Sequence, residues 1–208
     1  MTSRERLAPT LAMVALLVLA AWAASAHLTL GFRAFTSEDA RRIRIAAAPA
    51  AVSALRVFDA QGVPHALWGA DASVRVWLVT FVYTRCPTVC LTLGSEFQQL
   101  QASLGQRADG VRLASLSFDR ARDSPEALAA YSKRFGVDRE RWLVAVPASD
   151  AALSRLLREA GVVVIDDDAG GYAHNAAIHV VTASGTLVAL FDMDRHREAL
   201  ALARELAR

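Results

Sequence analysis

The sequence predicts one α/β domain, in which helices cover both faces of a central mixed sheet, behind an N-terminal apolar segment. First, runs of β-branched and aromatic residues alternate with segments of helical periodicity along most of the chain. Second, 208 residues, of which 54% are apolar, are enough for one well-packed domain and an appendage. Third, a long stretch without charged residues runs from Leu7 to Phe32.

The charge distribution argues against nucleic acid as a partner. Lys and Arg total 23 against 21 Asp and Glu, and the basic residues are scattered among acidic ones. The sequence shows no internal repeat or low-complexity tract beyond an alanine bias, so it does not predict a solenoid or a disordered tail.

Residues 1–32 are expected to direct the protein to a membrane. No Asp, Glu, Lys or Arg lies between Arg6 and Arg33. The stretch is either a signal peptide cut after Ala24-Ser25-Ala26 or an uncleaved anchor of about 20 residues. Both export the rest of the chain. Because apolar residues continue past the cleavage pattern, we expect the anchor, with Arg4 and Arg6 in the cytoplasm.

Residues 33–54 are expected to be a linker, with a short helix over 37–45, and the globular domain is expected at 55–208. The domain opens with a hairpin over 55–69, followed by a central strand over 74–84 and a helix over 90–106. Further elements are predicted at residues 111–119 (strand), 124–136 (helix capped by Ser124), 141–147 (strand), 150–161 (helix), 175–192 (hairpin turning at Ser184-Gly185) and 194–208 (helix). In such a sheet a site usually opens at the carboxyl ends of the strands.

The two cysteines of the chain, Cys86 and Cys90, come directly after the predicted central strand. If Pro87 is the first helical residue, Cys86 lies at a helix N-terminus, which should make its thiol more acidic. A helical i, i+4 spacing would then put the two Cβ atoms about 5–6 Å apart. The pair could hold one soft metal ion or form a disulfide, either redox-active or merely structural; two inert core cysteines are a further alternative.

A metal held by two thiolates usually needs a third ligand, and imidazole is the commonest nitrogen donor. We expect His27, His65 and His196 to be surface or interfacial residues, and His179 to be an ordinary strand residue. His174 follows the stretch "DDDAGGYA" and precedes a strand, which suits a ligand delivered by a mobile loop. It is therefore the candidate third ligand.

Three segments resemble the SCO/SenC family of thioredoxin-fold copper proteins of the inner membrane. They are "VWLVTFVYTRCPTVC", "SLSFDRARDSPEALAAY" and "GGYAHNAAIHVVTASGTLVALF". The resemblance covers residues 55–208 and implies a thioredoxin-like fold, one copper ion, Cu(I) or Cu(II), held by Cys86, Cys90 and His174, and a supporting role for Asp119. It also implies a single-pass protein of the bacterial inner membrane whose C-terminal domain lies in the periplasm, or a secreted one if the chain is cut near Ala26.

The implied function is a copper metallochaperone, not an enzyme, that supports assembly of the CuA centre of cytochrome c oxidase. Its partners would be the oxidase subunit carrying CuA and an upstream periplasmic copper donor. The alternative is a thiol–disulfide oxidoreductase that reduces the cysteines of an apo copper site through a Cys86–Cys90 disulfide. The family commonly has Pro and Asp where this chain has Leu91 and Ala173, and loss of that Asp would remove a polar group near the imidazole. We expect the acidic run Asp166–Asp168 to be a solvated loop.

Overall fold

The structure is a computed structural model that describes residues 3–69, 71–86, 89–104, 110–168 and 170–208, with backbone only at 3–8 and 89–91. Residues 1–44 and 45–208 form two structural units. The elements in chain order are α1 (Ser3–Leu28), α2 (Ser37–Ala47), β1 (Ala50–Ala51), β2 (Leu55–Asp59), β3 (Pro64–Leu67), β4 (Val76–Val82), α3 (Val89–Leu104), β5 (Val111–Ser117), α4 (Pro125–Arg134), β6 (Trp142–Pro147), α5 (Asp150–Ala160), β7 (Val164–Asp166), β8 (Tyr172–His174), β9 (Ile178–Thr182), β10 (Thr186–Phe191), the short 3-10 helix η1 (Met193–Arg195) and α6 (His196–Leu206).

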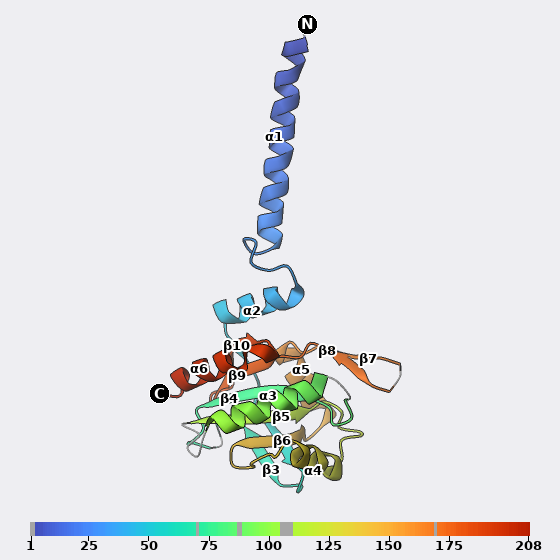
Figure 1. Cartoon of the computed structure of the whole chain (residues 1–208), viewed down its shortest axis with the longest axis vertical. Coiled ribbons are helices and arrows are strands. Elements are labelled where there is room, and N and C mark those ends of the chain that lie inside the picture. The colour runs from blue at the N-terminus through green and yellow to red at the C-terminus, as the bar shows by residue number, and fades with distance from the viewer. Residues whose placement is uncertain (1–2, 70, 87–88, 105–109, 169) are drawn as a thin grey trace. The chain divides into compact units, whose positions relative to one another are not determined.

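The second unit is built on a mixed sheet (Figure 1). Its strand order is β1-β10-β9-β4-β5-β6-β2-β3. β4, β5 and β6 run parallel, and the remaining strand pairs are antiparallel. All seven residues of β4 are buried, as the near-continuous apolar run of this central strand predicts. The carboxyl ends of the three parallel strands therefore share one edge of the sheet.

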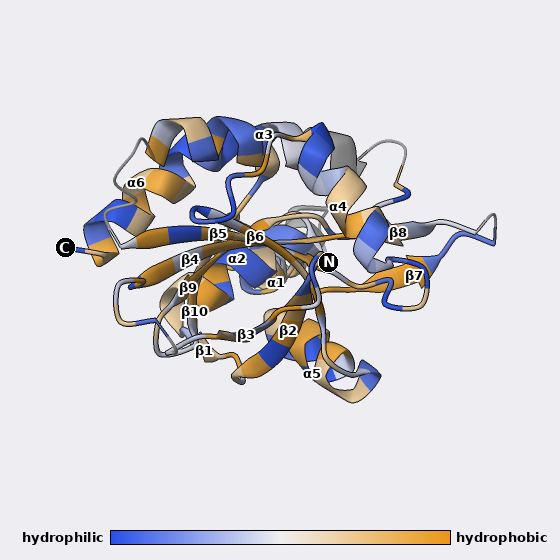
Figure 2. Ribbon diagram, turned by 90° about the horizontal axis from the view of Figure 1, so that it is seen from below, coloured by the Kyte–Doolittle hydropathy of each residue, from blue (hydrophilic) through white to orange (hydrophobic). Residues whose placement is uncertain are grey.

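Helices cover both faces of the sheet, which confirms the predicted α/β class (Figure 2). α3, α4 and α6 lie on one face and α5 lies on the other. Ser124 caps α4, because its hydroxyl accepts a 3.3 Å hydrogen bond from the Ala127 amide, and Pro125 is the first helical residue. α5 begins at Asp150 as predicted, but the capping side chain is that of Ser149.

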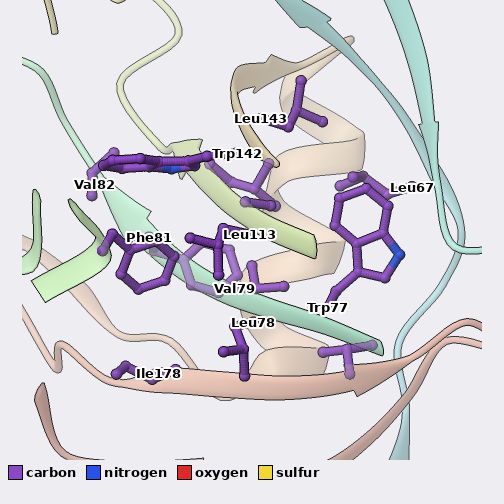
Figure 3. Close-up of a cluster of buried hydrophobic side chains, with 14 of the residues drawn as sticks. Leu67, Trp77, Leu78, Val79, Phe81, Val82, Leu113, Trp142, Leu143 and Ile178 are labelled. Carbon is purple, nitrogen blue, oxygen red and sulfur yellow. The ribbon is translucent and has the colours of Figure 1, made fainter. Parts of the chain in front are cut away.

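The core fills the space between the sheet and these helices with large aliphatic and aromatic side chains. Figure 3 shows Trp142, Leu113, Leu78 and Ile178, each of them no more than 1% exposed, in one continuous cluster. Burial of such side chains contributes about 1.5–3 kcal/mol each. The core thus fixes the positions of β4 and β5, whose ends carry the candidate site.

The first unit contains α1, whose stretch Pro9–Leu28 is long and apolar enough to cross a membrane. A signal sequence would meet the same criterion. α2 begins with a reciprocal cap in which the Thr36 hydroxyl accepts from the Asp39 amide at 3.0 Å, and the Thr36 amide donates to the Asp39 carboxylate at 3.1 Å. α2 confirms the short helix predicted at this place.

Two features differ from the elements read from the sequence. β1 pairs with β10, and the side chain of Val52 is 5% exposed in the core, so ordered packing begins upstream of Leu55. In addition, β7 and β8 pair as a separate two-stranded sheet, although the sequence predicted a loop before His174. Strands of three residues around an Asp- and Gly-rich turn give too little alternation to be recognised from sequence.

Candidate metal centre

Cys86 lies just beyond the carboxyl end of β4, where the sequence placed it. The chain leaves the strand at Tyr83 and turns, and the Cys86 amide donates a 3.3 Å hydrogen bond to the Tyr83 carbonyl. Cys86 is 7% exposed. A thiol at this edge of a parallel sheet lies where ligands of α/β folds usually bind.

The buried carboxylate of Asp123 holds the turn before Cys86. It accepts hydrogen bonds from the Thr84 amide at 2.9 Å, from the Thr84 hydroxyl at 2.7 Å and from the Ser117 hydroxyl at 2.6 Å. The turn after β4 is therefore bound to the end of β5. Sequence reasoning missed Asp123, because an acidic residue just before a helix normally indicates only the helix start.

Cys90 is the second residue of α3. Its side chain lies outside the described residues, as do Pro87 and Thr88. Three expectations therefore stay predictions: the helical spacing of the two thiols, Pro87 as the first helical residue, and a Cys86–Cys90 disulfide. The replacement at Leu91 also concerns a side chain outside the described part of the chain.

His174 is the last residue of β8 and pairs with Val164 of β7. It is thus held in a β-hairpin, which corrects the expectation of a mobile loop. Its ring packs edge-on against Phe118, with 5.1 Å between the ring centroids. Burial lowers the pKa of His174 below its ordinary value of 6.5, so the imidazole is neutral at pH 7 and can offer a nitrogen lone pair.

Tyr83 brings the cysteine turn and the histidine hairpin together. Its hydroxyl accepts a 3.2 Å hydrogen bond from the Tyr172 amide, and the Tyr83 and Tyr172 rings meet edge-on with centroids 5.3 Å apart. Phe118 completes the cluster, with centroids 5.4 Å from Tyr83 and 5.6 Å from Tyr172. The structure therefore places the segment of Cys86 beside the segment of His174.

Asp119 supports this hairpin through an arginine. The buried Asp119 carboxylate accepts a 2.6 Å hydrogen bond from Arg122 Nε. The Arg122 guanidinium in turn lies 4.9 Å from the Tyr172 ring centroid and donates to the Gly170 carbonyl at 2.6 Å. Asp119 thus acts on the hairpin by way of Arg122.

Ala173 lies on the other face of the hairpin from His174. Successive residues of a strand alternate between faces, and Ala173 pairs with Ile165 whereas His174 pairs with Val164. Ala173 is exposed, and Ile165 is 61% exposed. The replacement of Asp by Ala at this position therefore alters the outer surface of the hairpin, which corrects the expectation of a lost polar group beside the imidazole.

The other histidines take part in separate contacts. His179 is 1% exposed in β9 against the Phe81 ring, the ordinary strand position that we expected. His65 Nε2 lies 2.9 Å from the Asp59 carboxylate, and His196 Nδ1 lies 2.6 Å from that of Glu96. His27 is in α1. The side chains of Asp166, Asp167 and Asp168 are solvent-exposed as predicted, although Asp166 ends β7 instead of lying in a loop.

No group of three His, Cys, Asp or Glu side chains placed to hold a metal ion occurs among the described residues, which lack the Cys90 side chain. What the described part supplies is one thiol and one neutral imidazole on adjoining segments. Both are ligands that copper accepts.

The fold and the thiol at the end of its central strand define a thioredoxin-like α/β protein. A family model described as SCO1/SenC matches residues 56–207, and the chain belongs to this family. Among curated relatives it is similar to a SCO1 protein homolog of Bacillus subtilis (strain 168), with 29% identity over 68 residues. That match spans 33% of this chain and 35% of the relative.

Solved structures of the family share the fold. A SCO1/SenC family lipoprotein from Bacillus anthracis superposes with a TM-score of 0.69 at 20% identity, over 77% of this chain and 98% of the other. The copper-bound ScoI of Bradyrhizobium japonicum gives a TM-score of 0.61 at 23% identity, over 76% of this chain and 99% of that protein. These likenesses confirm the predicted thioredoxin-like architecture.

Proposed function

We propose that the chain is a membrane-anchored copper carrier that binds one copper ion through Cys86, Cys90 and His174 and supports assembly of the CuA centre of cytochrome c oxidase. The observation that carries this proposal is the contact between Tyr83 and Tyr172. It holds the segment of a buried thiol against the segment of a half-buried, neutral imidazole.

The donor set suits copper as cargo. Thiolates are soft ligands that favour Cu(I), and an added imidazole nitrogen favours Cu(II), so two sulfurs and one nitrogen accept both oxidation states. The Phe118 ring packs edge-on against the His174 imidazole, and Phe118 in turn contacts the rings of Tyr83 and Tyr172, so the imidazole packs against an aromatic cluster that joins the two segments. The copper-bound structure of a family member of the same fold supports this assignment.

The apolar stretch of α1 supports an inner-membrane location, with residues 1–32 as anchor, a linker that ends before β1, and a periplasmic copper-binding domain from β1 onward. A periplasmic donor would supply the metal, and the oxidase subunit carrying CuA would receive it. N-terminal sequencing of the mature protein tests the anchor. A soluble chain that begins at His27 would contradict it and leave only export.

A thiol–disulfide oxidoreductase is the second candidate function. It is favoured by the position of Cys86, which is buried yet lines a cavity that opens beside α4. Such a protein would need Cys86 and Cys90 but would tolerate loss of His174.

Copper titration of the full chain in detergent separates the two functions. We expect one copper per chain, a strongly coloured Cu(II) form, loss of tight binding in Cys86→Ser and Cys90→Ser, and selective loss of Cu(II) in His174→Ala. His65→Ala is the matched control, because His65 contacts Asp59 in another part of the domain. Full oxidase activity in a His174→Ala strain, together with no oxidase activity in a Cys86→Ser strain, would exclude the copper-carrier function.

A further inference from the structure

A cavity of about 270 Å³ lies beside Cys86 on the side of α4. Its lining residues are Thr84, Cys86, Ala127, Ala130, Tyr131, Arg134 and Phe135. None of these belongs to the β7–β8 hairpin, so within the described part of the chain the cavity is separate from the surface around His174. Of the three proposed copper ligands, Cys86 lines the cavity, and neither Tyr83 nor Tyr172 is among the described lining residues.

Rigid side chains shape this cavity. Tyr131 and Phe135 are buried, and their ring centroids are 4.7 Å apart. Gly94 of α3 makes room for the second ring, because a Cβ at this glycine would lie 2.3 Å from Phe135 Cζ. The wall opposite the Cys86 turn is therefore fixed by packing between α3 and α4.

The cavity carries positive charge. Arg134 is the one charged residue among the described residues that line it, and no carboxylate side chain is among them. The Arg134 guanidinium lies 5.8 Å from the Phe135 ring centroid, which places it over a wall of the cavity. Lys133, which precedes Arg134 in the helix, is exposed but does not line the cavity.

We propose that this cavity is a binding site for a small anionic thiol that reacts at Cys86. At about 270 Å³ it is slightly smaller than pockets for drug-sized ligands, which start at about 300 Å³, so it fits a cysteine-sized group. Arg134 selects for a carboxylate or sulfonate on that group, and the sulfur of Cys86 is the atom that reacts with its thiol. The inference rests on the proposed function, to which it adds the reductant that keeps the copper ligands as thiols.

The chemistry is a two-step thiol–disulfide exchange. A small thiolate attacks the Cys86 sulfur of the oxidised pair, the Cys86–Cys90 bond breaks, and Cys90 leaves as a thiolate. A second small thiolate then attacks the sulfur of the first one, releasing the Cys86 thiolate and a small disulfide. Two electrons pass from the two small thiols to the protein, and their two protons end on Cys86 and Cys90.

The test measures access to Cys86 in the full-length Cys90→Ser chain without copper. Two methanethiosulfonate reagents are compared, one bearing a sulfonate and one a trimethylammonium group. In each reaction the Cys86 thiolate forms a mixed disulfide and methanesulfinate leaves. Each rate is divided by the rate of the same reagent with the urea-unfolded chain, and we expect the anionic reagent to react roughly tenfold faster than the cationic one.

Matched variants on one helix decide the result. Arg134→Gln should abolish the preference for the anionic reagent, whereas Lys133→Gln should retain it. Ala130→Leu should slow the reaction of both reagents, whereas Ala129→Leu should not, because Ala129 is exposed and lies outside the cavity. Equal effects of the two Gln variants, or of the two Leu variants, would overturn the inference. Copper titration of the same proteins tests the proposed function separately, because the modification rates require no metal.

Discussion

The carboxylate of Asp123, in the turn before α4, accepts hydrogen bonds from both the amide and the hydroxyl of Thr84, at 2.9 Å and 2.7 Å. Thr84 is two residues before Cys86 in the chain. Because Asp123 also accepts from the Ser117 hydroxyl at 2.6 Å, one buried carboxylate binds the end of β5 to the turn that carries the thiol. Asp123 therefore positions the turn that carries Cys86.

Asp123→Ala should lower the free energy of unfolding by about 2–4 kcal/mol, since it leaves one buried and two half-buried donors without their acceptor. Asp123→Asn retains one acceptor oxygen and should cost about half as much. Urea unfolding measures both values, and copper titration should show weaker binding in the same order. Asp150→Ala, whose side chain is 87% exposed, is the control. Wild-type stability in Asp123→Ala would show that the Thr84 contacts contribute nothing.

Tyr83→Phe should separate the hydrogen bond from the ring packing between the two segments. The variant keeps the aromatic contact with Tyr172 but removes the hydroxyl that accepts from the Tyr172 amide at 3.2 Å. We expect a loss of about 1 kcal/mol in stability and a changed Cu(II) spectrum, while Cu(I) binding persists. An unchanged Cu(II) electron paramagnetic resonance signal would mean that the hydroxyl does not position His174.

The sequence was most informative where one local rule decided the structure. The apolar run of β4, the Ser124 cap and the place of Cys86 after a buried strand follow from composition and periodicity alone. The β7–β8 hairpin did not, because its three-residue strands are stabilised by contacts with residues distant in the sequence, such as Tyr83. Asp123 was also missed, because a carboxylate that accepts from Thr84, 39 residues away, leaves no local pattern.

Acid should remove the stabilising effect of Asp59, a buried carboxylate of β2. Burial opposes its ionisation, but hydrogen bonds from His65, the Val63 and Gln61 amides and Arg139 outweigh burial and lower the pKa of Asp59 below its ordinary 3.8. A lowered folded-state pKa gives stability that is present above the unfolded-state pKa and lost as the pH falls through the folded one.

Asp59→Asn should therefore destabilise the domain by about 1–3 kcal/mol at pH 7, and the difference from wild type should shrink from about pH 4 downward. Urea unfolding across this pH range measures it. Asp150→Asn, at an exposed position, should show no such trend. A difference that stays constant down to pH 2 would assign the loss to packing instead of charge.

Ala173→Asp should alter partner docking and leave the metal unchanged. Because Ala173 pairs with Ile165 on the outer face of the hairpin, a carboxylate there would project away from His174 and enter a surface where Ile165 is 61% exposed and Val163 is 56% exposed. We expect Cu(II) affinity and spectrum to stay within about twofold of wild type, since the imidazole keeps its partners Val164 and Phe118.

Delivery to the proposed oxidase acceptor should change in the same variant, because a new carboxylate beside the exposed Ile165 side chain alters the charge on the outer surface of the hairpin. Oxidase activity in cells that express Ala173→Asp measures this effect. Arg208→Asp, at an exposed position outside the hairpin, is the control. If copper affinity falls instead while oxidase activity per bound copper is preserved, residue 173 acts on the metal ligand, and the prediction that Ala173→Asp affects docking and not the metal is wrong.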